Sequence, residues 1–296
     1  MLLIIAGPTA CGKTEAAECI ARKIGGEIIS ADSGIRYRKT VIGTGRTSLA
    51  DDVPYHAIDY LDPREYSSSY EWVVRARKAV DDITSRGRTP IICGGTMHFI
   101  ELFIQGMDAS PPPDPDLRAF LKNLERVTGP GALHDLLETL NPETAMNVHP
   151  NDIGRTIRHI ERTLGRHATT GIPGYKGEYR SLFLVRDREA LNKRIRNRTD
   201  RMMEMGWVEE VRMLLDEGYT TDSPGFMSTG YGHVLSIVQG GTSIEECISR
   251  VNRDTIDLSR KQMRWAGRLN AELIYHDDPS SQGRPAERIL QVLDEE

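Results

Sequence analysis

Eight residues near the start of the chain could do chemistry together, because Gly7 to Thr14 follow the pattern G-x-x-x-x-G-K-T. Glycines in such a loop let successive backbone N–H groups turn toward one anionic site. Lys13 adds a point charge, the Thr14 hydroxyl can ligate magnesium, and the helix expected to follow contributes its positive end. We therefore assign phosphate binding to the whole loop, namely Gly7, Pro8, Thr9, Ala10, Cys11, Gly12, Lys13 and Thr14.

A carboxylate follows the second predicted strand, at Asp32 in Ile28-Ile-Ser-Ala-Asp-Ser33. Most loops of this pattern hold ATP, and an NTPase also needs an acidic group for magnesium and a group that positions water or a hydroxyl. Asp32 can take such a role, because the end of its strand would bring it close to the loop. The alternative is an ordinary helix or turn cap made by Asp32 or Ser33.

Strands and helices alternate in the first third of the chain, which is typical of a parallel sheet with ligands at the carboxyl ends of its strands. We expect strands at 2–6, 27–30 and 89–93 and helices at 14–24 and 70–85. The side chains expected to face inward are Ala17, Ile20, Ala21 and Ile24 on the first helix and Val73, Val74, Val80 and Ile83 on the second.

The Pro-rich stretch 109–115 interrupts this alternation, since proline cannot continue a helix or strand. Beyond it we expect helices at 116–126, 131–140 and 152–166, a return connection at 169–177, a strand at 180–186, helices at 187–205, 208–217 and 243–265, and a strand at 272–275. The fold class is therefore α/β. We interpret 1–108 and 180–296 as a P-loop core with a parallel sheet, like that of nucleotide kinases, and 109–179 as a mainly helical insertion.

Charge is segregated along the 296 residues, whose formal net charge is −5. Residues 154–201 hold 13 Lys or Arg against 5 Asp or Glu. Such a segment on an acidic protein is a plausible footprint for RNA, and a solvated helix face with paired arginines is the alternative. The four cysteines lack metal-type spacing, and no apolar run is long enough to cross a membrane. We expect a monomeric cytoplasmic protein with no membrane partner.

Further segments occur in a fixed order along the chain. They are Asp32-Ser33, Tyr37, Ile42-Gly43-Thr44, Val53-Pro54-Tyr55-His56-Ala57-Ile58-Asp59, Asp62-Pro63, Pro90 to Thr96, Phe99, His149-Pro150-Asn151-Asp152, Arg155, Arg158, Glu161, Met205-Gly206, Glu209-Glu210-Val211, Gly230-Tyr231, Arg260-Lys261-Gln262 and Trp265. Each piece is weak alone. The ordered set, from about Leu3 to Trp265, resembles the tRNA dimethylallyltransferases, also called tRNA isopentenyltransferases.

The resemblance implies that the loop holds the diphosphate of dimethylallyl diphosphate, with Mg2+ at Thr14. The prenyl group would pass to the exocyclic amine of an adenosine next to the anticodon of tRNA. Asp32 would accept the amine proton, while Lys13, the loop amides and Thr14 would stabilise the leaving diphosphate. Thr96, in Gly94-Gly95-Thr96, would lie at the reaction channel.

The resemblance also implies a set of residues that contact tRNA. They are Asp32, Ser33, Gly34, Ile35, Thr96, Arg118, Gly154, Arg155, Thr156, Ile157, Arg158 and Gln262. Arg155 and Arg158 are three residues apart on a predicted helix, so both can face one phosphate backbone. Ion pairs with Glu161 or Asp152 are the alternative for these two arginines.

The chain departs from the family close to the chemistry. Met227 and Gly232 stand where the family usually has Arg and Arg or Lys, and the first of these arginines is thought to help hold diphosphate. We hypothesise that Arg36 or Arg38 supplies the missing charge. Three other functions stay open: an ATP-using phosphotransferase for small molecules, a prenyltransferase for free adenine nucleotides, and a non-catalytic tRNA-binding relative.

Overall fold

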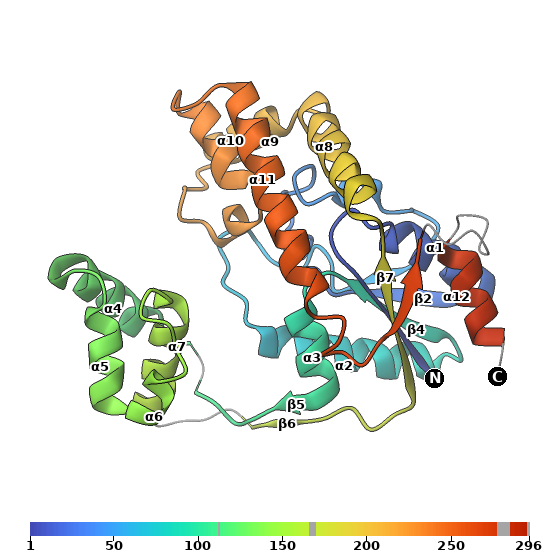
Figure 1. Ribbon diagram of the computed structural model, residues 1–296, viewed down its shortest axis with the longest axis horizontal. Coiled ribbons are helices and arrows are strands. Elements are labelled where there is room, and N and C mark those ends of the chain that lie inside the picture. Colours follow the sequence, from blue (N-terminus) through green and yellow to red (C-terminus); the bar gives the residue numbers. More distant parts are fainter. Residues whose placement is uncertain (112, 166–169, 277–284, 295–296) are drawn as a thin grey trace. The chain divides into compact units, whose positions relative to one another are not determined.

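The computed structural model describes residues 1–111, 113–165, 170–276 and 285–294. The chain divides into two compact units, which are drawn in Figure 1. One unit comprises 1–104 and 175–296, and the other comprises 105–174. No helix among the described residues is long and apolar enough to cross a membrane.

Within the described residues, the first unit is built on a six-stranded parallel sheet with the order β3-β2-β4-β1-β7-β8. Its strands are β1 (Leu2–Ala6), β2 (Gly26–Ser30), β3 (Tyr55–His56), β4 (Thr89–Gly94), β7 (Tyr179–Val185) and β8 (Glu272–Tyr275). Every residue of β1 and β2 is buried. Continuous apolar runs of this kind suit parallel strands that are covered on both faces.

Helices cover this sheet and extend beyond its carboxyl edge. They are α1 (Lys13–Ile24), α2 (Ser69–Ser85), α3 (Met97–Gln105), α8 (Arg188–Glu204), α9 (Trp207–Asp216), α10 (Tyr231–Val238), α11 (Ile244–Met263) and α12 (Pro285–Asp294), with short 3-10 turns at Arg46–Ser48 and Pro224–Met227. Side chains of α1 and α12 pack with the central strands in one core cluster. A second cluster joins α9, α10 and α11.

The second unit is mainly helical. It holds α4 (Pro115–Thr128), α5 (Ala132–Leu140), α6 (Pro142–Ala145) and α7 (Ile153–Leu164), and the short antiparallel strands β5 (Gly106–Met107) and β6 (Ile172–Pro173). Asp114 caps α4 by accepting hydrogen bonds from two backbone N–H groups, directly after the Pro-rich stretch. Leu121, Leu137 and Ile160 are among the side chains in its own core.

Two predicted inward positions are wrong. Val74 is 46% exposed and Ile24 is 36% exposed, because each lies at the border of its helix's apolar face. The remaining core positions predicted on α1 and α2 are buried. The helices α3, α10 and α12 were not predicted, and the predicted positions Arg166 and Thr169 lie outside the described residues.

Candidate active site

The phosphate-loop pattern lies between β1 and α1, where the chain turns sharply. Gly12 precedes the helix at φ 102°, a left-handed conformation that glycine takes without strain. A Cβ on Gly7 would lie 2.8 Å from Cys11 Sγ and 3.0 Å from the Leu184 carbonyl oxygen, so this close approach also requires glycine. Lys13 Nζ donates to the Pro8 carbonyl at 3.1 Å, across the mouth of the loop. The first N–H groups of α1 lack helical partners and are available to an anion.

Arginines of the basic segment brace this loop from outside. Each of three arginines, from the end of β7 and from α8, donates to one of three consecutive loop residues: Arg186 Nε to the Cys11 carbonyl at 3.2 Å, Arg194 Nε to the Ala10 carbonyl at 2.8 Å, and Arg198 Nη1 to Thr9 Oγ1 at 3.2 Å. Three arginines of the basic segment that the sequence suggested for RNA therefore bond the phosphate loop of the first unit.

Gln262 of α11 ties the loop to the end of β4. Its Oε1 accepts from the Thr9 N–H at 2.8 Å, and its Nε2 donates to the Gly95 carbonyl at 2.8 Å. The side chain is 9% exposed. Since both ends of the amide are occupied, we assign Gln262 a positioning role, and its tRNA contact stays a prediction.

Asp32 and Thr96 lie together at the carboxyl ends of β2 and β4. Asp32 Oδ1 accepts from the Gly34 N–H at 2.8 Å, and Thr96 Oγ1 accepts from the Ser33 N–H at 3.0 Å. Among the described residues, no donor bonds the second carboxylate oxygen of Asp32. The turn that the sequence left open as the alternative for Asp32 is therefore present, it leaves one carboxylate oxygen available, and the catalytic role of Asp32 stays a prediction.

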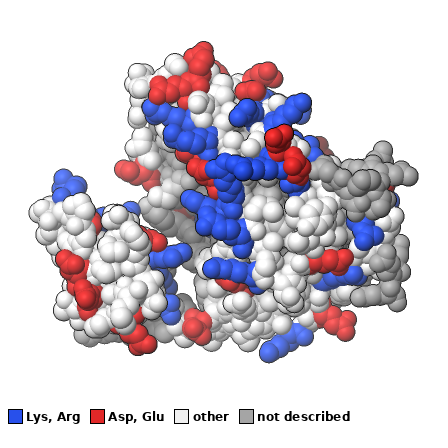
Figure 2. Space-filling model, in the orientation of Figure 1, with Lys and Arg blue, Asp and Glu red and all other residues white. Residues whose placement is uncertain are grey.

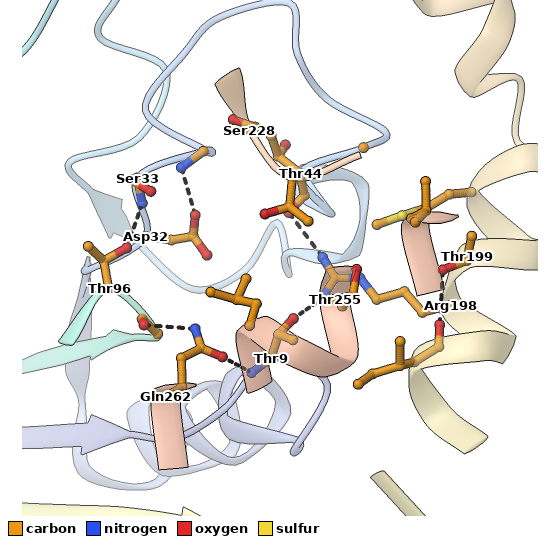
Figure 3. A pocket seen from close by; sticks show the side chains of 18 of the residues that line it. Thr9, Asp32, Ser33, Thr44, Thr96, Arg198, Thr199, Ser228, Thr255 and Gln262 are labelled. Carbon is orange, nitrogen blue, oxygen red and sulfur yellow. Dashed lines mark hydrogen bonds between the residues drawn. The ribbon is translucent and has the colours of Figure 1, made fainter. Parts of the chain in front are cut away.

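A pocket of about 300 Å³ joins these groups. Thr9, Asp32, Ser33, Thr96 and Gln262 form its polar wall (Figure 3). Apolar side chains from α8, α9 and α11 form its apolar wall, namely Ile195, Met202, Trp207, Val251 and Leu258, and the polar Arg198, Thr199 and Thr255 line the pocket from α8 and α11 as well. The pocket thus combines polar and apolar groups and reaches the phosphate loop at Thr9.

Arg198 is the cation in this pocket, and sequence reasoning missed it. Its Nη2 donates to the Thr44 carbonyl at 3.2 Å, in addition to the bond with Thr9. Burial lowers the pKa of its guanidinium, and the negative charge of Asp32 partly offsets that effect. The available signal was the spacing Arg194 to Arg198, which puts both arginines on one face of α8.

The two arginines proposed to replace the missing family charge lie elsewhere. Arg36 stacks over the rings of Tyr37 and Phe99 at 5.2 and 5.6 Å, and Arg38 is exposed. Neither lines the pocket, so Arg198 is the better placed cation. Met227 lines the pocket mouth and is 69% exposed.

Gly232 lines a neighbouring pocket of about 480 Å³, together with Met227 and Lys261. Of the two departures from the family pattern, Met227 lines both pockets and Gly232 lines only the second.

The predicted arginines of the second unit surround a buried carboxylate. Glu161 has a side chain only 1% exposed, and it accepts from Arg118 at 2.7 and 3.0 Å and from Arg158 at 3.2 Å. Burial raises the pKa of Glu161, but the Arg118 hydrogen bonds and charge bring it below its ordinary value. Arg155 is 74% exposed and pairs with Asp152 at 3.3 Å. The ion pairs that the sequence left open are thus present, and tRNA contacts of these residues stay a prediction.

The fold and the loop together define a P-loop α/β protein with a pocket beside its phosphate loop. The family model described as "IPP transferase" matches residues 36–269. The chain is 36% identical to a tRNA dimethylallyltransferase of Thermomicrobium roseum, over 100% of this chain and 92% of that protein. It is 37% identical to a tRNA dimethylallyltransferase of Thermotoga neapolitana, over 93% and 92%.

A solved structure resembles the chain along its whole length. It is the tRNA delta(2)-isopentenylpyrophosphate transferase of Staphylococcus epidermidis, with a TM-score of 0.70, 28% identity, and coverage of 100% of this chain and 99% of that one. The chain belongs to the IPP transferase family. The predicted family, the α/β fold with its P-loop core, and the enzyme class of prenyltransferase acting in tRNA modification are confirmed.

Proposed function

We propose that this chain transfers a dimethylallyl group from dimethylallyl diphosphate to the exocyclic amine of an adenosine next to the anticodon of tRNA, with release of diphosphate. The observation that carries the proposal is the mixed lining of the pocket that reaches the phosphate loop. A prenyl diphosphate has one strongly anionic half and one apolar half, and the pocket offers Thr9 of the loop and Arg198 to the first and Met202, Trp207 and Leu258 to the second. Burial of the apolar half favours binding.

The leaving group gains negative charge as the bond between the prenyl carbon and the diphosphate oxygen breaks. Lys13, the loop N–H groups and Arg198 surround the place where that charge develops. Donors held in position by a folded structure stabilise such charge without reorganising during the reaction. The loop is held in this way, because Gln262 and three arginines fix it from outside.

Asp32 acts as the general base in this proposal. The new bond between carbon and nitrogen forms while the amine loses a proton, and the free oxygen of Asp32 accepts that proton. The Thr96 hydroxyl already accepts from the Ser33 N–H, so its own hydrogen is available to the adenine. Asp32 and Thr96 thus present an acceptor and a donor side by side, which suits an aminopurine edge.

The Thr14 hydroxyl, at the phosphate loop, fits a magnesium ion. It is an oxygen donor of the hard type that Mg2+ prefers, and the free Asp32 oxygen is left to accept the amine proton. When bound, magnesium would neutralise charge on the diphosphate. Thr14 would hold it, in keeping with a family that uses diphosphate substrates.

The tRNA is proposed to contact exposed cations of the first unit. Figure 2 shows Lys and Arg side chains gathered in the middle of the face drawn, over α11. Lys261 in the last turn of α11 and Arg264 at its C-cap are exposed and have no ion pair with any described residue, and Arg268 stacks on Trp265 at 5.1 Å. Cations without an ion-pair partner are suited to bind RNA phosphates. Such phosphate contacts fix the position of the RNA and do not select its sequence.

The target base has to leave its stack to reach Asp32. Removal of a base from a stack costs a few kcal/mol, and the cost is lowest in single-stranded RNA. Loops of RNA are the usual targets of specific recognition for this reason. An anticodon loop therefore fits a catalytic carboxylate set inside a pocket better than a duplex does.

The test incubates the full chain with dimethylallyl diphosphate, Mg2+ and unmodified tRNA, followed by mass spectrometry of the nucleosides. We expect a gain of one prenyl unit on adenosine, which Asp32→Asn and Lys13→Ala each abolish. Asp222→Asn is the matched control, because Asp222 is exposed and lies outside the pocket wall. Parallel reactions with labelled ATP or with free AMP as acceptor test the other functions, and turnover there without tRNA modification would refute the proposal.

A further inference from the structure

Trp207 is the largest side chain in the apolar wall of the pocket. It is the first residue of α9 and only 1% exposed. Besides lining the pocket, it belongs to the hydrophobic cluster that joins α9, α10 and α11. The indole therefore lies between the pocket on one side and a packed core on the other.

Two glycines hold the indole edge-on. A Cβ on Gly43 would lie 2.3 Å from Trp207 Nε1, and a Cβ on Gly230 would lie 2.3 Å from Cη2. Real Cβ atoms do not approach that closely, so any side chain at either position would displace the ring. Both glycines belong to segments of the family pattern, Ile42-Gly43-Thr44 and Gly230-Tyr231. The backbone is thus shaped to admit a residue as wide as tryptophan at this place.

Behind the indole the core is full. The Tyr231 ring meets it edge to face, with centroids 5.3 Å apart, and Tyr231 is completely buried. The Tyr231 hydroxyl donates to Glu210 Oε1 at 2.7 Å, and the other oxygen of Glu210 accepts from the backbone N–H groups of Val41 and Ile42. This bonded framework prevents the ring from moving back, because interiors packed in this way yield little.

We propose that Trp207 sets the longest prenyl chain that the pocket admits, by closing the pocket behind a five-carbon group. This inference rests on the proposed function, since it concerns the donor of that reaction. A smaller side chain at position 207 extends the pocket toward Tyr231 and lets it take a ten-carbon allylic diphosphate. Trp207 is thus a specificity residue: it contacts the prenyl tail, and the phosphate loop, Asp32 and Thr96 are unchanged by its replacement.

The indole N–H makes replacement by phenylalanine informative. Trp207 Nε1 is buried and bonds no described group within normal hydrogen-bond geometry, although its N–H acts on the neighbouring Tyr231 hydroxyl and partly offsets the rise that burial causes in the pKa of Tyr231. Tyr231 keeps its bond to Glu210 without this N–H, so Trp207→Phe mainly removes ring volume. Trp207→Leu removes more of the ring and opens the pocket further.

The experiment measures kcat/KM of the full chain with dimethylallyl diphosphate and with geranyl diphosphate, on the same tRNA, for the unaltered chain, Trp207→Phe and Trp207→Leu. Val211→Ala is the matched control, since Val211 lies one turn further along α9 in the same cluster and does not line the pocket. We expect the ratio of ten-carbon to five-carbon transfer to rise at least tenfold in Trp207→Leu, to rise less in Trp207→Phe, and to stay unchanged in Val211→Ala.

An unchanged ratio in a folded Trp207→Leu or Trp207→Phe chain overturns the inference, as does equal use of both donors by the unaltered chain. Should Trp207→Leu not fold, the ratio in Trp207→Phe decides. Failure of the proposed function has a different signature, namely no transfer from either donor by the unaltered chain. In that case, the test is thermal stabilisation of each chain by unreactive thiolodiphosphate analogues of both lengths. Stabilisation by the ten-carbon analogue in the Trp207 variants alone supports the inference that Trp207 limits chain length. Equal stabilisation of all chains by that analogue refutes it.

Discussion

Replacement of Arg198 tests whether the pocket's cation holds the departing diphosphate. The side chain reaches from α8 to the phosphate loop, where its two terminal nitrogens bond Thr9 and Thr44 at 3.2 Å. Neither bond is to a carboxylate, so the positive charge is not neutralised within hydrogen-bond distance by any described residue. A charged hydrogen bond to a ligand contributes about 1.5–3 kcal/mol. At 1.36 kcal/mol per decade, Arg198→Gln should lower kcat/KM by roughly ten- to hundredfold.

The assay measures kcat and KM for dimethylallyl diphosphate at saturating tRNA, together with thermal unfolding of each variant. Arg198→Lys keeps the charge and loses the planar fork, so we expect it to recover part of the lost rate. Arg196→Gln is the control, because Arg196 is exposed on the same helix and its replacement changes the net charge by the same amount. If Arg198→Gln loses no more activity than Arg196→Gln, the assignment of diphosphate binding to Arg198 is wrong.

Three further outcomes follow from the structure. Hydrogen bonds from Arg86 lower the pKa of Glu27, whose side chain is 4% exposed, to about 2 from 4.5, so its stabilisation is present above pH 4.5 and is lost as the pH falls toward 2. Urea titrations should show Glu27→Gln less stable by about 2 kcal/mol at pH 7, which is below the roughly 3 kcal/mol of the full pKa shift because Arg86 is half exposed. The difference from the unaltered chain should shrink as the pH falls toward 2 and disappear below it. Glu161→Gln breaks a buried ion pair and should destabilise the second unit by about 3 kcal/mol, measured by hydrogen exchange of 105–174, and full protection there would refute it. Chelation by EDTA should abolish transfer and added Mg2+ should restore it, with Thr14→Ala needing more metal for half-maximal rate; chelator-resistant activity would contradict the magnesium assignment.

The parts of the fold that sequence could predict are those with a local cause. The strands of the sheet are continuous apolar runs, and the loop after β1 carries glycines at the positions that its turn and close contacts require. The position of Asp32 near the phosphate loop was predictable for the same reason, because the residue that follows a parallel strand lies at the carboxyl edge of the sheet. In each case a few neighbouring residues determine the outcome.

Contacts between distant segments were not predictable in this way. Gln262 bonds Thr9 across 253 positions, and Arg198 bonds it across 189. Helical periodicity places each residue on a face but does not say which element that face will meet. Trp207 is a further case, because a large apolar residue at the start of a helix is ordinarily core, and only the pocket shows that one side of it meets a ligand cavity.

The phosphate loop alone did not decide between ATP and a prenyl diphosphate, and the structure gives the physical reason. Loop N–H groups and Lys13 recognise phosphate oxygens, which both ligands present alike. The ligands differ beyond the phosphates, where ATP carries a polar ribose and a prenyl diphosphate carries hydrocarbon. The groups that line the pocket beyond the loop come mainly from α8, α9 and α11, far along the chain, and they include the apolar Met202, Val251 and Leu258 beside Arg198, Thr199 and Thr255. The loop sequence says nothing about these residues, so it could not by itself decide which ligand the protein binds.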